Sequence, residues 1–401
     1  MAKLLEITGK AISGEWGQDD DTGTGIPVLR TTNFTNEGFV NYKNVVTRSI
    51  PKKNIAEKYL RHGDIIIEKS GGSDKQPVGR VIFFEGEENK YLFNNFTGLL
   101  RIRNMEEWLP KYVFYALFAY YRNGGTRAFE NRTTGLHNLQ VDNYVKSVDI
   151  PRRSYQEQQH ICEALDHVRD TIASREHQLT KLDELVKARF VEMFGDPKLN
   201  PCRFPCNSLS TYITFLTSGS RGWSQYFTDS GEYFITIKNV KNCKITLQDV
   251  QYVTPPDNAE AKRTKVQKND LLISITADLG RTGVVTEEIA NHGAYINQHL
   301  TCIRLKDEQV NPLYVAYYME SDAGKEQFTA KNQSAVKAGL NFNAINSLKL
   351  MVPPLSLQNQ FAAFVAEVDK SKLFVGGDVS RKPFDIGFFS KSTVQRLIKE
   401  V

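Results

Sequence analysis

The feature that most constrains the fold of this 401-residue chain is an internal duplication. Segments of the first half recur in the second half in the same order, without a catalytic signature in either copy. The matched pairs are Gly63–Ile67 with Asn269–Ile273, Gly79-Arg80 with Gly280-Arg281, Tyr91–Asn94 with Ala294–Asn297, Pro110–Val113 with Pro312–Val315, Gly135-Leu136 with Gly339-Leu340, and Pro151–Gln158 with Pro353–Gln360. In the last pair a Pro, a Ser and two Gln residues share one offset of 202. The duplication predicts two homologous modules with approximate internal two-fold symmetry, which suits a two-part target.

Composition predicts a soluble, globular chain with more than one core. Hydrophobic residues make up 40% and charged residues 24%, and the net charge of +5 is compatible with a polyanionic partner. No long apolar window and no signal-peptide core occur, so we expect a cytosolic protein without membrane contact. The five cysteines lack the spacing of a disulfide framework or a zinc site, and we expect plain thiols and no metal.

Each copy reads as an α+β module. Short β-branched or apolar runs at 65–67, 81–84 and 99–102 are bounded by Gly, Asn and Asp, which is typical of strands. A stretch rich in Tyr, Phe, Ala and Leu follows at 110–121 with Pro at its start, which favours a helix. The second copy repeats this pattern, with strands at 271–275 and 283–285 and a helix at 312–320.

A long helix is predicted between the modules, over 154–194. Ser154 and Glu157 spell a capping box, no Pro or Gly interrupts the segment, and Gly195-Asp196-Pro197 ends it. Forty residues at about 1.5 Å each would span roughly 60 Å. Apolar residues recur at coiled-coil spacing, at Ile161, Leu165, Val168, Ile172, Leu179, Leu182 and Val186. The alternative is an ordinary long helix that packs on its own domain.

A second helix is expected to pair with this seam. We expect Ser356 to cap it, and its apolar residues are Phe361, Phe364, Val365 and Val368. Gly376-Gly377 and Pro383 limit it to about twenty residues, so Leu179, Leu182 and Val186 are expected to be exposed or covered by the tail or another subunit. The predicted boundaries are 1–152 and 198–354 for the modules, 153–197 and 355–374 for the helices, and 375–401 for a divergent tail.

The order of module, helix, module, helix resembles the DNA specificity subunit of type I restriction-modification systems. The resemblance is carried by Val141–Gln158, Arg189–Pro197 and Gly339–Gln360, and it covers residues 1 to about 373. It implies a non-catalytic subunit in which each module reads half of a bipartite DNA site. It also implies that the two helices pair antiparallel, set the gap between the half-sites and dock two modification (methyltransferase) subunits. ATP-dependent restriction subunits would complete the assembly, and S-adenosylmethionine, ATP and Mg would be bound by partner subunits, with no cofactor on this chain.

Candidate DNA-contacting residues lie in polar, glycine-containing segments of both modules. Arg, Lys, Asn, Gln, Ser and Thr side chains can bond base edges or phosphates, although each segment taken alone could equally be a solvated turn. The candidates are Arg30, Thr31, Asn33, Lys69, Ser70, Lys75, Gln76, Arg127, Arg132 and Thr133 in the first module, and Arg221, Trp223, Lys238, Asn239, Lys331, Asn332, Gln333 and Lys337 in the second.

Signatures of other functions are incomplete in this sequence. Asn311-Pro312-Leu313-Tyr314 resembles the motif of adenine methyltransferases but has Leu for its second Pro and no glycine-rich cofactor loop. Asp64 with Glu68-Lys69 lacks the spacing of a metal-dependent nuclease, and a turn before a strand is the favoured role of Asp64. No phosphate loop for ATP occurs. A coiled-coil scaffold without a DNA role is the remaining alternative.

Overall fold

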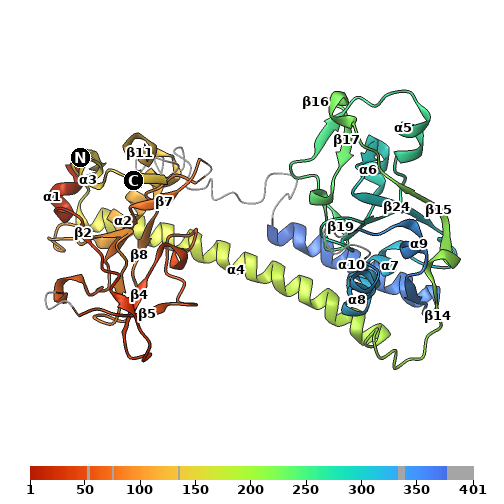
Figure 1. Cartoon of the computed structure of the whole chain (residues 1–401), viewed down its shortest axis with the longest axis horizontal. Coiled ribbons are helices and arrows are strands. Elements are labelled where there is room, and N and C mark those ends of the chain that lie inside the picture. Colours follow the sequence, from red (N-terminus) through yellow and green to blue (C-terminus); the bar gives the residue numbers. More distant parts are fainter. Residues whose placement is uncertain (52–54, 75, 134–135, 333–338, 377–401) are drawn as a thin grey trace. The chain divides into compact units, whose positions relative to one another are not determined.

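The computed structural model describes residues 1–51, 55–74, 76–133, 136–332 and 339–376 (Figure 1). The chain divides into two compact units, and the division falls within the long helix α4 (Tyr155–Phe194): the first unit is Met1–Ile172 and the second begins at Ala173. The expected tail from residue 377 onward lies outside the described residues, as do the candidate residues Lys75, Gln333 and Lys337.

The described part of the first unit contains four small sheets. Their strands, in spatial order, are β2 (Ile12–Ser13), β10 (Thr97–Leu100), β6 (Ile65–Glu68) and β8 (Val81–Phe83); β3 (Gln18–Asp19), β5 (Val46–Ser49), β4 (Ile26–Leu29) and β9 (Leu92–Phe93); β11 (Glu130–Thr133), β12 (Leu136–Leu139) and β7 (Ser70–Gly72); and β1 (Ala2–Lys3) with β13 (Asp149–Ile150). Neighbouring strands are antiparallel except for β4 and β9. The helices are α1 (Leu4–Thr8), α2 (Pro110–Arg122) and α3 (Val141–Ser147), with 3₁₀ turns η1 (Thr31–Asn33), η2 (Ala56–Lys58) and η3 (Gly125–Phe129).

The second unit repeats three of these sheets. They are β15 (Ile213–Ser218), β24 (Leu300–Leu305), β21 (Leu271–Ser274) and β22 (Thr282–Val284); β16 (Phe227–Thr228), β20 (Gln251–Val253), β17 (Glu232–Ile235) and β23 (Ala294–Ile296); and β14 (Cys206–Ser208) with β25 (Lys349–Met351). A further two-stranded sheet consists of β18 (Val240–Lys241) and β19 (Lys244–Ile245). The helices are α5 (Ala259–Thr264), α6 (Glu287–His292), α7 (Pro312–Glu320), α8 (Asp322–Ala330), α9 (Phe342–Asn346) and α10 (Leu355–Gly376), with turns η4 (Leu209–Tyr212), η5 (Trp223–Tyr226) and η6 (Ile237–Asn239).

The central strand of each unit is buried on both faces. Ile65 and Ile67 of β6 face one core of the first unit, whereas Ile66 faces another, because side chains alternate across a strand. In β21, Leu271 and Ile273 lie in one core and Leu272 in another. The apolar runs therefore form strands covered on both sides. The predicted α+β fold and its duplication are confirmed.

The predicted long helix is also confirmed, because α4 runs without a break for 40 residues. At its start the Ser154 N–H and hydroxyl both donate to the Glu157 carboxylate at 2.7 Å, and the Glu157 N–H donates to the Ser154 hydroxyl at 3.3 Å. At its end Gly195 adopts a positive φ of 74° and its N–H closes the last turn on the Val191 carbonyl.

The helix α10 begins two residues earlier than the sequence match implied. It starts at Leu355, so its offset from α4 is 200 rather than 202. Gln158 and Gln358 are the equivalent residues, because both are fully buried and make the same hydrogen bonds. Each donates its NH₂ to the backbone carbonyl five residues earlier. The Gln158 oxygen accepts the N–H of the residue before α2, and the Gln358 oxygen accepts the N–H of the residue before α7. Ser356 lies inside the first turn of α10, and the expectation that it caps this helix was wrong. The identical Pro and Ser residues of the sequence match therefore do not occupy equivalent positions in the two helices, because their offset differs by two residues from that of the helices.

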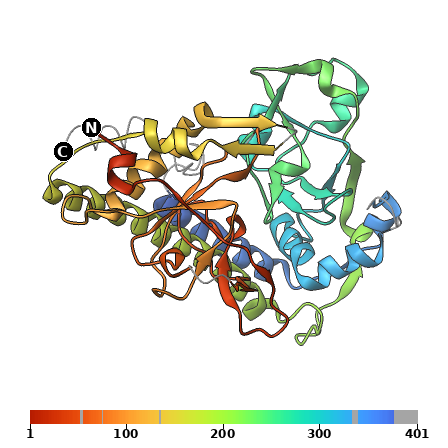
Figure 2. The ribbon, with the colours of Figure 1, turned by 60° about the vertical axis from the view of Figure 1, so that its left-hand side comes forward.

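Within the second unit α10 pairs antiparallel with α4, as predicted (Figures 1 and 2). Phe361, near the start of α10, packs edge-to-face on Phe190 at 5.3 Å between ring centroids. Farther along, Lys372 forms an ion pair with Asp183. The length of α10, 22 residues, matches the predicted short second helix.

The apolar seam of α4 changes partner along its length. Ile161 and Leu165 are buried in the core of the first unit, and Val168 and Ile172 are half-buried. In the second unit Val186 is buried in the same core as Phe361, Val365 and Val368, Leu182 and Phe364 pack against that core, and Leu179 is half-buried. The expectation that Leu182 and Val186 are exposed or covered by the tail or another subunit was wrong, since both pack with the apolar residues of α10 in this core.

Candidate nucleic-acid interface

A buried aspartate at the start of the central strand binds an arginine in both modules. The Asp64 carboxylate accepts two bonds from Arg101, at 2.6 and 2.8 Å. The Asp270 carboxylate accepts two from Arg304, at 2.8 and 2.9 Å. Each aspartate also accepts the backbone N–H three residues earlier at 2.7 Å, which closes the turn before the strand. Their role in turns is confirmed, and the paired guanidinium groups occupy the oxygens that a nuclease would offer to a cation.

The motif resembling a methyltransferase is the start of a helix. The Asn311 carboxamide oxygen accepts the N–H groups of Leu313 and Tyr314 at 2.9 and 3.4 Å, and its NH₂ donates to Asn359 at 2.9 Å. Asn311 is therefore the N-cap of α7, a role that favours asparagine.

Two asparagines proposed to contact DNA are structural, which corrects that prediction. Asn33 is buried; its oxygen accepts the Arg30 N–H at 3.0 Å and its NH₂ donates to two backbone carbonyls at 3.0 and 3.3 Å. Asn239 is buried in the same way, bonded to the N–H and hydroxyl of Thr236 and to two carbonyls. Both side chains direct their hydrogen bonds to the residue before the 3₁₀ turn and to the loop after it, so they cannot read a base.

Trp223 is a core residue, a second correction. It is 3% exposed and packs on Phe234 and Tyr295 with ring centroids 5.4 and 5.0 Å apart. Its neighbour Arg221 is exposed. Burial of a large aromatic ring stabilises the module and removes the ring from any ligand surface.

The other candidates lie at separate places. Arg221, Lys238 and Asn332 are exposed, whereas Thr31, Ser70 and Lys331 are half-buried. Arg30 is also half-buried, and it donates to the Asn44 carbonyl at 3.2 Å. Arg132 and Thr133 lie in β11, where only the backbone is described. Lys69 donates to the Ser13 hydroxyl at 3.2 Å. Burial, and next the charge of Lys58, lower the pKa of Lys69.

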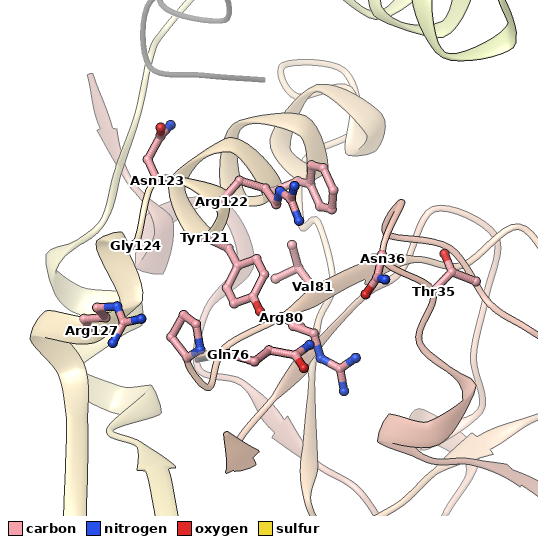
Figure 3. A pocket seen from close by; sticks show the side chains of 12 residues that line it. Thr35, Asn36, Gln76, Arg80, Val81, Tyr121, Arg122, Asn123, Gly124 and Arg127 are labelled. Atoms are coloured by element: carbon pink, nitrogen blue, oxygen red, sulfur yellow. The ribbon is translucent and has the colours of Figure 1, made fainter. Parts of the chain in front are cut away.

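Two candidates, Gln76 and Arg127, come together at a pocket of the first module that we call the arginine pocket (Figure 3). Its volume is 590 Å³, and among the described residues its lining contains three arginines and no carboxylate. The lining residues are Thr35, Asn36, Gln76, Pro77, Arg80, Val81, Phe118, Tyr121, Arg122, Asn123, Gly124 and Arg127. Figure 3 shows Arg127 entering from the side opposite Asn36, with Tyr121 and Arg122 between them. Sequence reasoning missed Arg80, Tyr121 and Arg122, although the repeated Gly79-Arg80 was a usable signal.

The three arginines of the pocket are held differently. Arg80 donates two bonds to the buried Glu68 at 3.1 Å and one to the Thr31 carbonyl at 3.2 Å. Arg127 donates to the Asp74 carbonyl at 3.1 Å. Arg122 is exposed on the last residue of α2. Glu68 thus balances the charge of Arg80, whereas Arg122 and Arg127 give the pocket its positive charge.

Two glycines set the course of the backbone at the pocket: Gly124 lines it and Gly79 precedes the lining residue Arg80. Gly79 has a φ of 102°, and a Cβ there would lie 2.8 Å from the Thr126 side chain, so only glycine lets β8 start this close to η3. Gly124, with a φ of 74°, ends α2 and directs the chain into η3. Burial, and next the charge of Glu68, raise the pKa of Tyr121, so its hydroxyl stays protonated at neutral pH.

Among the residues that the structure describes, no cluster of three or more His, Cys, Asp and Glu is arranged to hold a metal ion. Over the same residues, no helix has the length and apolarity needed to cross a membrane.

The fold defines a duplicated protein in which each α+β module is followed by a helix. The family model of the type I restriction modification DNA specificity domain matches residues 2–184 and 224–373. The two matches cover most of the chain: the first takes in the first module and most of α4, and the second takes in most of the second module and of α10. The chain belongs to this family.

Individual relatives are distant. The type I restriction enzyme EcoBI specificity subunit of Escherichia coli is 20% identical over 140 residues, which are 34% of this chain and 28% of that protein. The S subunit of a type I restriction-modification system from M. genitalium has a similar fold, with a TM-score of 0.55 at 14% identity over 99% of this chain and 95% of that one. A chain solved to study complex assembly of the type I R-M system gives a TM-score of 0.55 at 15% identity, over 99% of this chain and 96% of that one.

Proposed function

We propose that this chain is the sequence-reading subunit of a type I restriction-modification complex, in which each module reads one half of a bipartite duplex DNA site. The observation that carries the proposal is the position of the two family matches, because each falls on one copy of the duplicated module and its helix. One chain with two reading modules accounts for a target in two parts.

The chemistry of the first module supports DNA as the ligand. The arginine pocket presents two cationic side chains, Arg122 and Arg127, and several amide groups that can bond phosphates or base edges. The chain itself would be non-catalytic, and S-adenosylmethionine, ATP and Mg would be bound by its partners. The engagement of Asp64, Asp270 and Asn311 in ion pairs and a helix cap supports this division of labour.

The helices would set the gap between half-sites and dock two modification subunits, with restriction subunits completing the assembly. Apolar side chains exposed on α4 and α10 support protein docking: Leu185, Val191, Leu373 and Phe374 are all more than 45% exposed. The same residues would serve a scaffold without a DNA role, which is the second candidate function.

Salt dependence separates these candidates. A DNA reader that neutralises several phosphates loses duplex affinity steeply as salt rises, because each contact releases condensed counterions. We expect the full chain, bound to its modification subunits, to lose about 10³-fold in affinity between 50 and 200 mM salt if it makes six phosphate contacts. A scaffold would bind duplex DNA weakly at every salt concentration.

Methylation mapping tests the specific function. The chain is co-expressed with its modification subunit and methylated adenines are mapped genome-wide. We expect one bipartite motif with a fixed gap. A folded complex that methylates without any such motif would contradict the proposal.

A further inference from the structure

We propose that Arg127 is a specificity-determining residue of the first module and that the arginine pocket reads a guanine of the first half-site. The inference rests on the proposed function, since it assigns a base to a module taken to read DNA. It begins from the difference between the two copies of the fold.

The two modules differ at the place where the arginine pocket lies. Residues that both modules keep must perform tasks that both halves share, whereas two different half-sites require different reading residues. Gly79 and Gly280 are equivalent, but Gly79 is covered by Thr126 of η3, and Gly280 lies where a Cβ would be 2.3 Å from Phe328 of α8. The second module therefore fills this place with an apolar ring that the first module lacks.

The charge at this place differs as well. Helices α2 and α7 both begin with proline, and Phe118 of the pocket corresponds to Glu320. The Glu320 carboxylate accepts the N–H groups of Thr282 and Cys243 at 2.9 and 3.0 Å. A cationic pocket in one copy thus stands where the other copy has a carboxylate bound to the backbone.

The donors of the pocket favour guanine. In the major groove guanine presents two acceptors, N7 and O6, and a guanidinium group can bond both at once. The residues described in the lining carry three guanidinium groups and no carboxylate, so they complement an edge of acceptors better than the donor of cytosine.

Arg127 is the arginine with both a fixed position and free donors. Its Nη2 donates to the Asp74 carbonyl at 3.1 Å, which holds the side chain, and its Nη1 and Nε groups carry no bond in the described structure. In Arg80, Nε and Nη2 donate to Glu68 and to the Thr31 carbonyl, so only Nη1 remains to donate to a ligand. Arg122 makes no hydrogen bond to the described residues, which suits contact with a phosphate more than the reading of a base.

The test compares methylation motifs of the full chain with its modification subunits. We expect Arg127→Ala to lose the preference for one guanine in one half-site, while the other half-site and the gap stay unchanged. Arg127→Lys should relax the same position, because a lysine keeps the charge but lacks the rigid planar fork that bonds O6 and N7 in parallel. It also keeps the result interpretable if the alanine variant folds poorly.

Arg122→Ala is the matched control from the same pocket. It should keep every letter of the motif, weaken duplex binding across sequences and reduce the slope of log K against log salt by about one. An unchanged motif in both Arg127 variants, or a change in both half-sites, would overturn the assignment. If the wild-type complex has no bipartite motif, the proposed function fails instead.

Discussion

Arginine and asparagine side chains perform two tasks in this protein, and their hydrogen bonds separate the tasks. Asn33 and Asn239 direct every donor and acceptor at their own loops. Arg101 and Arg304 each neutralise a buried aspartate. Arg127 donates one hydrogen bond, to the Asp74 carbonyl, and its remaining donors are the ones we propose for a base. Residue type alone could not distinguish these cases, which is why the sequence placed the asparagines among the DNA contacts.

The five thiols should divide into two reactive and three protected groups. Cys202 and Cys206 are exposed, whereas Cys162, Cys243 and Cys302 are buried. Burial raises the pKa of Cys162 to about 12 and raises the pKa of Cys243 and Cys302 well above the usual value, so these thiols stay protonated and unreactive near neutral pH. A thiol reagent at pH 8 should label two cysteines in the folded chain and five in denaturant. A third label on the folded chain would contradict the burial described here.

Replacing Gly79 by alanine should destabilise the first module more than replacing Gly23. Both glycines have positive φ, which costs an alanine roughly 1–2 kcal/mol. A Cβ at Gly23 meets nothing within 4 Å, but one at Gly79 lies 2.8 Å from Thr126. We expect Gly79→Ala to cost at least about 1 kcal/mol more, measured as a lower urea midpoint. Equal midpoints would mean that Thr126 moves aside freely.

At the scale of elements, periodicity and end signals predicted the helices well. The bounds of α4 followed from Ser154, Glu157 and Gly195, because caps and glycine act locally. The register of α10 relative to α4 could not be predicted from the sequence in the same way. The sequence match aligned identical letters at an offset of 202, whereas burial aligns Gln158 with Gln358 and Ile161 with Phe361. Tertiary contacts fix that register, and identical letters do not report them.

A pair of serine variants tests the corrected register. Ser154→Ala removes a capping hydroxyl and should cost about 1 kcal/mol of unfolding free energy. Ser356→Ala changes an exposed residue inside the first turn of α10 and should stay within about 0.5 kcal/mol of wild type. Both values are measured by chemical denaturation. An equal loss in the two variants would restore the register implied by the sequence.

At the scale of the whole molecule, the duplication was visible in the sequence because buried strands and helix starts repeat, as in Ile65–Ile67 and Leu271–Ile273. The arginine pocket was not visible. Its lining comes from three separated segments between Thr35 and Arg127, which only the folded chain brings together. The sequence also did not predict that the apolar seam of α4 packs on a different core in each unit. An apolar repeat indicates that one face of a helix is buried, but it does not identify the residues that bury it.

Lengthening α4 tests the proposed role of the helix in setting the gap. Seven residues inserted after Arg175, within an exposed stretch, add about 10 Å and return the helix face to within about 20°. At about 3.4 Å per base pair, the gap of the methylated motif should lengthen by about three base pairs, with both half-sites unchanged. The control is the same insertion at Gly23, an exposed residue before β4, which should leave the gap as it was. A lengthened helix that folds, methylates and keeps the original gap would show that something other than α4 sets the distance between half-sites.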